Sequence, residues 1–205
     1  MAASGALLLG AVVTAAVVGP QDANSTTTPQ AANDAGLDTF KVDKVHSALH
    51  FRIRHMDVSN FVGRFNSFDG TFQLDPDNLD QSSFQMEVDL GSVDTNSEGR
   101  NNHLKNADFF NIAEENTATF RSTEVTSVDG KRFIVRGDLT FLGKTNPVDV
   151  QMELVGIGDT RQGYKAGIDA TFTFKRSDFG NMTYVAAKAL GDEVTMYITM
   201  AGVRQ

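Results

Sequence analysis

Four histidines are the side chains of this chain best suited to proton transfer or metal binding. His46, His50 and His55 lie near one another in the sequence, and His103 lies well beyond them. On an extended strand His46 and His50 point to one face, whereas His55 points to the other. No cysteine is present to complete a set of metal ligands. We therefore expect no metal site.

The segment from Gly137 to Thr145 is similar to a phosphate-binding loop, but five residues separate its two glycines where that motif requires four. Its alternation of apolar and polar residues is typical of a strand that leads into a hairpin. No Gly-x-Ser-x-Gly motif occurs in the chain, so no serine has the setting of a nucleophile. The sequence predicts neither nucleotide binding nor nucleophilic catalysis.

Composition narrows the classes of partner. The chain has 18 basic and 26 acidic residues, a net charge of −8, and no cluster of Lys and Arg. Nucleic-acid binding needs such clusters, so we expect no nucleic-acid partner. Fifteen Phe accompany three Tyr and no Trp, so the apolar surfaces carry few polar groups. Such a lining suits a ligand that offers hydrocarbon.

Six stretches of the chain alternate apolar and polar residues, most regularly from Pro147 to Val155. Side chains along a strand point to opposite faces, so each stretch is expected to be a strand with one apolar face. The apolar residues that we expect to line a shared interior are Leu49, Phe51, Ile53, Phe84, Met86, Val88, Phe133, Val135, Leu139, Phe141, Val148, Val150, Met152, Ile168, Phe172, Phe174, Met196 and Ile198. Most alternating strands pack into a filled core, which the pattern alone favours over a cavity.

Weaker strand patterns lie at 39–43, 61–74 and 117–128, which brings the expected total to eight or nine strands. This predicts an all-β domain, either a sandwich or a sheet that closes so that no edge stays unpaired. The alternation of apolar and polar residues does not say which face of the sheet points inward. An outer-membrane barrel with its apolar face outward is an alternative, although the aromatic girdles of Trp and Tyr typical of that class are nearly absent.

One short helix is expected between strands, from Glu98 to Asn106, with Asn96 or Ser97 as its N-cap. Arg100 and His103 share a face of this helix, which we expect to lie across one end of the sheet.

The polar head of an amphipathic ligand would need partners there, and the candidates are Arg100, His103, Arg176, which follows a strand, and His55, which ends an apolar row. In the alternative interpretation, Arg100 pairs with Asp89 or Asp108, and Arg176 begins an ordinary turn that contains Asp178 and Gly180.

The first residues differ in character from the rest of the chain. Residues 6–18 form an apolar run that is too short to span a bilayer comfortably and has the length of a secretory h-region. No basic residue precedes Lys41, so the usual positive n-region is missing. We expect residues 1–23 to be a signal-peptide-like segment, 24–38 to be a disordered linker and 39–205 to be one β domain.

Particular residues along the β domain resemble those of the YceI-like, polyisoprenoid-binding family. They are His46, Ser47, Phe51, His55, Gly63, Arg64, Phe65, Gly70, Asp89, Ser92, Val93, Thr95, Arg100, His103, Leu104, Asp108, Phe109, Phe110, Phe120, Gly137, Leu139, Gly143, Thr145, Pro147, Arg176, Asp178, Phe179 and Gly180. The resemblance runs from about Phe40 to Val203. No single motif is specific, and the ordered set carries the resemblance.

The resemblance implies an eight-stranded, lipocalin-like antiparallel barrel that is exported to the periplasm. It also implies a long isoprenoid lipid or isoprenoid quinone in the interior, which favours a cavity over a filled core. We accordingly expect a non-enzymatic carrier that needs no cofactor, with transient membrane contact and no nucleic-acid partner; the oligomeric state is open, with a dimer among the states to test. The alternative is an enzyme acting on a lipophilic substrate in the barrel, for which His55 is the one titratable group in the apolar rows.

Overall fold

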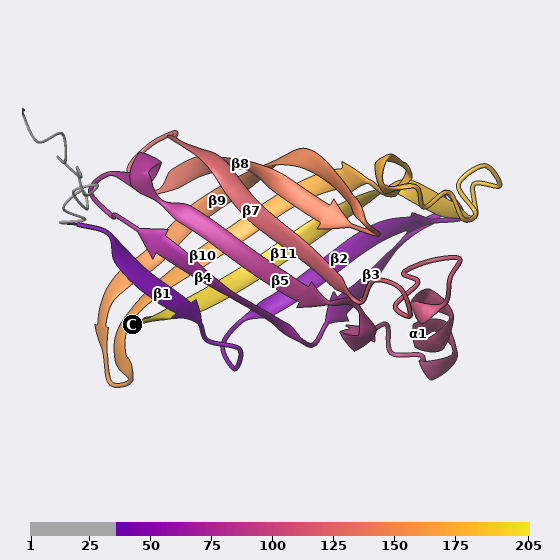
Figure 1. Cartoon of the computed structure of the whole chain (residues 1–205), viewed down its shortest axis with the longest axis horizontal. Coiled ribbons are helices and arrows are strands. Elements are labelled where there is room, and N and C mark those ends of the chain that lie inside the picture. The colour runs from indigo at the N-terminus through magenta and orange to yellow at the C-terminus, as the bar shows by residue number, and fades with distance from the viewer. Residues whose placement is uncertain (1–35) are drawn as a thin grey trace, which may run out of the picture. The chain divides into compact units, whose positions relative to one another are not determined.

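The computed structural model describes residues 36–205. The predicted leader, residues 1–23, and most of the predicted linker, residues 24–38, lie outside the described residues. The strands are β1 (Asp38–Val42), β2 (Ala48–His55), β3 (Ser59–Phe65), β4 (Phe68–Leu74), β5 (Ser83–Asp89), β6 (Val93–Asp94), β7 (Thr117–Ser127), β8 (Arg132–Phe141), β9 (Lys144–Thr160), β10 (Gly163–Lys175) and β11 (Leu190–Arg204) (Figure 1).

The strands form one closed antiparallel sheet in the order β1-β4-β5-β7-β8-β9-β10-β11-β2-β3-β6, with β1 also paired to β11. Three strands of the wall are interrupted, because β1 continues into β2, β3 into β4 and β5 into β6, each after a short bend. β1 and β2 both pair with β11. On their other side, β1 pairs with β4 and β2 pairs with β3. When each interrupted strand is counted once, the wall is an eight-stranded antiparallel barrel, which confirms the predicted fold class.

Burial follows the alternation predicted for the strands. In β9, Val150 and Met152 are buried, whereas Asp149 and Gln151 are exposed. The period of two therefore places the apolar rows inside the barrel and the charged rows outside. This contradicts the alternative in which the apolar face points outward. Within residues 36–205, no helix is long and apolar enough to cross a membrane.

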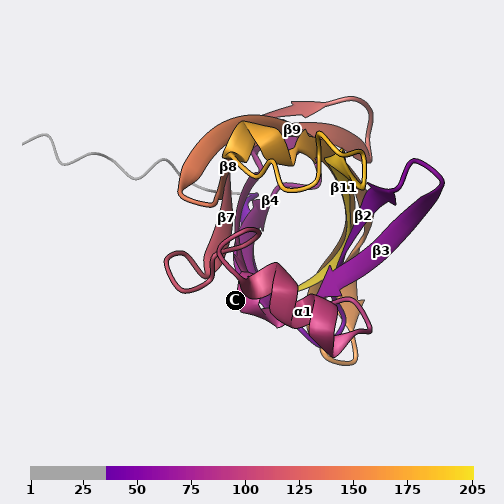
Figure 2. The same ribbon diagram turned by 90° about the vertical axis from the view of Figure 1, so that its right-hand side faces the viewer.

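The predicted helix is α1 (Glu98–Lys105), which ends one residue before the expected Asn106. Ser97 is its N-cap, and the Ser97 hydroxyl accepts a hydrogen bond from the Arg100 backbone N–H. Viewed from the end of the barrel, α1 lies along one edge of the opening (Figure 2). The 3₁₀ helices η1 (Leu79–Gln81), η2 (Leu90–Ser92) and η3 (Arg176–Phe179) were not predicted.

The end of the barrel opposite α1 is sealed by a column of aromatic rings. Tyr164, Phe40, Phe72, Phe84 and Phe133 stack in that order, with centroids 6.3, 5.1, 5.9 and 6.0 Å apart. The four phenylalanines are almost wholly buried. Close-packed interiors leave few voids, so this end is solid and offers a ligand no passage.

The bend between β1 and β2 is held by charged groups. The Asp43 carboxylate accepts a hydrogen bond from Lys165 Nζ at 2.8 Å, and His46 Nδ1 lies 2.8 Å from the same carboxylate. The ammonium of Lys165, and secondarily the ring of His46, holds the pKa of Asp43 well below its usual range. These contacts tie the first interrupted strand to β10.

Candidate functional site

The barrel contains an apolar cavity of about 460 Å³ that opens at the α1 end. This volume lies within the range of about 300–1,000 Å³ that is usual for small-molecule sites. The predicted residues that line the cavity are Leu49, Phe51, Ile53, Phe84, Met86, Val88, Leu139, Phe141, Val150, Met152, Phe172, Phe174, Met196 and Ile198. Their contact with a ligand stays a prediction.

Four residues predicted to line the cavity lie elsewhere. Phe133, Val135 and Ile168 are buried without contact with the cavity, and Phe133 belongs to the aromatic column. Val148 is half-buried and also lies off the cavity wall. The alternation of side chains along a strand predicts which face of the sheet a side chain occupies, but it does not predict how far along the barrel axis the side chain lies.

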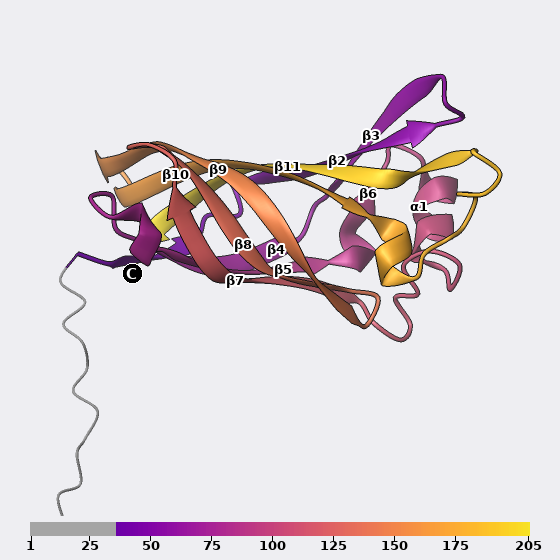
Figure 3. The same cartoon turned by 90° about the horizontal axis from the view of Figure 1, so that it is seen from above.

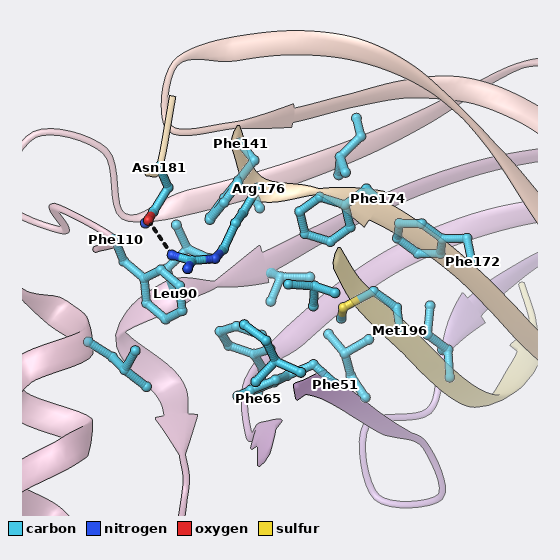
Figure 4. Close-up of a pocket in the computed structure, with 18 of the residues that line it drawn as sticks. Phe51, Phe65, Leu90, Phe110, Phe141, Phe172, Phe174, Arg176, Asn181 and Met196 are labelled. Carbon is cyan, nitrogen blue, oxygen red and sulfur yellow. Dashed lines mark hydrogen bonds between the residues drawn. The ribbon is translucent and has the colours of Figure 1, made fainter. Parts of the chain in front are cut away.

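The interior is hollow near α1 and solid at the far end. Phe172, Phe174 and Ile198 point inward yet remain only partly buried, whereas Phe40 and Val135 have no exposed surface. Figure 4 shows Phe172, Phe174 and Met196 projecting into the space between the strands. This arrangement contradicts the alternative of a core filled along its whole length.

Several lining residues were missed. They are Phe61, Phe65, Phe68, Leu90, Leu104, Phe109, Phe110, Ala118, Phe120, Ala170, Leu190, Val194 and Met200. Some follow the same parity in strands read as weak, such as Phe120 in β7. Others, such as Phe109 and Phe110, lie between α1 and β7, where no period marks a face. The signal available for these two was a pair of phenylalanines shortly after the end of a predicted helix.

Arg176 is a buried cation at the inner side of the mouth, with 4% of its surface exposed. Its Nη1 donates to Asn181 Oδ1 at 2.7 Å (Figure 4). Its Nε donates to the Gly191 carbonyl at 2.8 Å, and Nη2 donates to the carbonyls of Thr183 and Leu190 at 2.7 and 3.3 Å.

All of these acceptors are neutral. Burial lowers the pKa of Arg176 from its usual value, although a guanidinium still remains charged. The side chain holds the β10–β11 connection in shape and also faces the cavity. One of its five N–H groups, on Nη1, has no acceptor among residues 36–205.

Arg100 and His103 reach the mouth from α1, as their shared face predicted. Arg100 donates from Nε to Thr95 Oγ1 at 2.9 Å and from Nη2 to the Thr95 carbonyl at 2.7 Å, and its guanidinium stacks 4.3 Å from the Phe61 ring. The expected pairing of Arg100 with Asp89 or Asp108 is therefore wrong, because the nearby Thr95 satisfies two of its donors. It is His103 that pairs with Asp108, at 2.8 Å.

His55, the fourth candidate, is exposed at the end of β2 and also lines the mouth. The mouth is therefore cationic: its polar lining comprises Arg100, Arg176, two histidines and a few neutral groups. Among residues 36–205, no Asp or Glu side chain lines the cavity. In a protein of net charge −8, this distribution favours a neutral or anionic polar group at the opening over a cation. The same residues contain no cluster of His, Cys, Asp and Glu that could hold a metal.

Comparison with known proteins gives a consistent result. The model of the YceI-like domain matches residues 40–201. A UPF0312 protein from Pseudomonas aeruginosa is 37% identical over 177 residues, which cover 85% of this chain and 91% of that protein.

Solved structures share the barrel. That of BcnA from Burkholderia cenocepacia has a TM-score of 0.72 and 25% identity, covering 78% of this chain and 98% of BcnA. A polyisoprenoid binding domain from Saccharophagus degradans has a TM-score of 0.61 over 81% of this chain and 98% of that domain. At 15% identity, the latter likeness shows a common fold alone.

Proposed function

This chain belongs to the YceI-like family, and we propose that it is a non-enzymatic carrier that holds an isoprenoid lipid or an isoprenoid quinone in its barrel. One observation carries the proposal: the hollow is lined by hydrocarbon, closed at one end and cationic at the other. An amphipath with a long apolar tail and a compact polar head matches that distribution. The polyisoprenoid binding domain with the same fold supports the choice of tail.

The depth of the cavity favours a long tail. Its wall extends along β11 from Leu190 to Met200, which is about 33 Å of strand at about 3.3 Å per residue. Strand tilt of about 40° reduces this to a depth of about 25 Å along the axis. A cavity of this depth accommodates a long extended apolar tail, as a polyprenyl chain provides.

The two arginines supply donors for the head group. Among residues 36–205, one N–H of Arg176 has no acceptor, and three N–H groups of Arg100 have none, because Thr95 uses two of its five. Arginine binds phosphate oxygens well and remains charged at any physiological pH. A quinone carbonyl would accept from the same groups without the added charge interaction. Competition between a polyprenyl phosphate and an isoprenoid quinone would measure this difference.

Extraction of the natively purified protein with organic solvent, followed by mass spectrometry, tests the carrier function. We expect a stoichiometric prenyl lipid, or uptake of one when polyprenyl phosphate or quinone is offered in detergent. Repeated preparations with neither retained lipid nor uptake would refute the proposal. A water-soluble analogue that carries the head group without the tail is the control, and it should bind far more weakly.

The same proposal places the protein in the periplasm. It is supported by the apolar run of residues 6–18, which has the length of a secretory h-region. Fractionation of cells that express the full chain would locate the protein. Recovery from the cytoplasm with an intact N-terminus would count against this part of the proposal.

One contact favours the alternative of an enzyme. His103 lines the mouth and its Nε2 lies 2.8 Å from Asp108 Oδ2, so the carboxylate could orient the imidazole as a base toward a bound head group. His55 has no such partner among the described side chains. The discriminating result is turnover that disappears in His103→Ala or His55→Ala while lipid binding survives.

A further inference from the structure

The turns around the cavity mouth carry exposed apolar side chains. Met56 and Val58 lie at the tip of the β2–β3 hairpin, and Met182 and Tyr184 lie in the β10–β11 connection; we call these four residues the rim. Each is at least half exposed, and Val58 is 82% exposed. The hairpin extends past the barrel wall at the end where α1 lies (Figure 3).

The rim is continuous with the cavity. The Met56 backbone N–H donates to the Ala189 carbonyl at 3.0 Å, which joins the two turns. Met56 and Tyr184 also line the cavity, so the apolar surface passes from the interior onto the outer edge of the mouth. Isolated exposed apolar residues are ordinary. A set that lies together at the edge of an apolar cavity indicates an interaction surface.

The backbone of the rim is unusual as well. Met56 has φ of 51° and Tyr184 has φ of 60°, both in the left-handed region that disfavours side chains of this size. A tight hairpin turn prefers Asn-Gly at the positions that Met56 and Asp57 occupy. These turns thus keep large apolar side chains where glycine or asparagine would be less strained, and such departures concentrate at functional sites.

The partner that binds the rim must be able to supply or accept the proposed lipid ligand. The far end of the barrel is sealed, so a ligand enters and leaves through the mouth that the rim borders. A tail that crossed water would expose each of its CH₂ groups at a cost in free energy, whereas direct contact with a bilayer avoids this exposure. Tyr184 suits the membrane interface, where aromatic rings with a polar group concentrate. Arg54 and Lys188, which flank the rim, can reach lipid phosphates.

We propose that the rim docks on a lipid bilayer, with the β2–β3 tip and the β10–β11 connection inserted among the head groups, so that cargo passes directly between membrane and cavity. The inference rests on the proposed carrier function. The chain has a net charge of −8, and the rim is apolar rather than basic, so the insertion of side chains drives docking. Zwitterionic phosphatidylcholine vesicles are therefore the appropriate probe.

The test compares two double variants. Val58→Asp with Met182→Asp places charge on the rim, whereas Val45→Asp with Val128→Asp places it on sites of matched exposure away from the mouth. The exposed fractions are 82% and 56% for the rim pair and 85% and 56% for the control pair. Val45 lies in the β1–β2 bend, and Val128 lies in the β7–β8 turn at the sealed end.

Cosedimentation with phosphatidylcholine vesicles and transfer of a polyprenyl phosphate between vesicles are the readouts. Each apolar side chain removed from the rim should weaken docking about tenfold or more, since burial of a Val or Met side chain gives about 1.5–3 kcal/mol. We expect the rim pair to lose vesicle binding and to slow transfer, while the control pair behaves as the wild type. The wild-type transfer rate should rise with vesicle concentration.

The inference is overturned if the wild type does not bind vesicles, if both pairs lose binding equally, or if transfer requires an added acceptor protein. Uptake of the same lipid from detergent micelles separates the two proposals. The rim pair should take it up normally. If the wild type takes up none, the carrier function fails, and cosedimentation of the empty protein still reports on the rim.

Discussion

Replacement of Ala170 by phenylalanine should weaken lipid binding without lowering the stability of the fold. Ala170 lies on β10, where it pairs with Met152 of β9 and Ile198 of β11, and it is buried at the cavity wall. The larger side chain would project into the hollow, which has a volume of about 460 Å³. Filling a cavity usually stabilises a protein by about 0.5–2 kcal/mol. We therefore expect Ala170→Phe to unfold at an equal or higher denaturant concentration than the wild type.

The same ring should weaken ligand binding strongly. It displaces roughly six carbons of the tail, which corresponds to about 5 kcal/mol at about 0.8 kcal/mol per CH₂. A flexible tail can bend around the ring, so we expect at least half of this loss, or a weakening of about 50-fold or more. Titration with a polyprenyl phosphate in detergent measures the affinity, and chemical denaturation measures the stability.

Ala166→Phe is the matched control. Ala166 lies on the same face of β10, but it pairs with Gly202, where the Phe72 ring occupies the space of the missing side chain. A phenyl group there would overpack the sealed end and should destabilise the fold by about 1–3 kcal/mol or more. The reasoning about a hollow near α1 would be refuted if Ala170→Phe were as destabilising as Ala166→Phe, or if it bound the lipid as tightly as the wild type.

Three further predictions concern single residues. Phe172→Asp places a carboxylate in the apolar cavity and should abolish lipid uptake or folding; normal uptake with a normal circular dichroism spectrum would show that Phe172 does not face inward. Arg176→Met leaves the buried Asn181 side chain and three partly buried carbonyls without their donor and should cost about 3 kcal/mol or more in chemical denaturation; a loss below about 1 kcal/mol would contradict the assigned contacts. Asp43→Asn should lower the Tm at pH 7, because Lys165 holds the pKa of Asp43 below its ordinary value of 3.8 and the carboxylate stabilises the fold above that pH; the Tm difference should shrink as the pH falls below about 4, and a constant difference would refute the linkage.

The strands could be predicted from sequence because a single physical rule governs them. A period of two places every second side chain on one face, and a large sheet with one apolar face forms either a sandwich or a closed barrel. The family resemblance selected the barrel. Position along the barrel obeys no such rule. Phe133 and Phe172 lie in equally regular rows, yet one packs in the sealed end and the other borders the hollow. The difference depends on ring contacts between strands distant in sequence.

The polar part of the site was only partly predictable. Helical spacing correctly placed Arg100 and His103 on one face at the mouth. The hydrogen-bond partner of Arg100 was not evident from the sequence. Thr95 lies just before the helix, and its short side chain accepts from Arg100 in place of the more distant carboxylates. The burial of Arg176 was also unpredictable, since it depends on the fold of the β10–β11 connection around the guanidinium.

The aromatic column closes one end of the barrel, so a ligand moves in and out through the same opening. This fixes which end of the ligand moves first. A guest must go in with its hydrocarbon terminus leading and must come out in reverse, polar end first. A receiving membrane or enzyme would therefore engage the polar end while most of the chain is still sheltered. The hydrocarbon chain then leaves the barrel one short segment at a time. Each segment passes from the apolar cavity directly into the apolar interior of the receiving membrane or enzyme. Such stepwise release keeps the barrier to delivery low even for a very long chain.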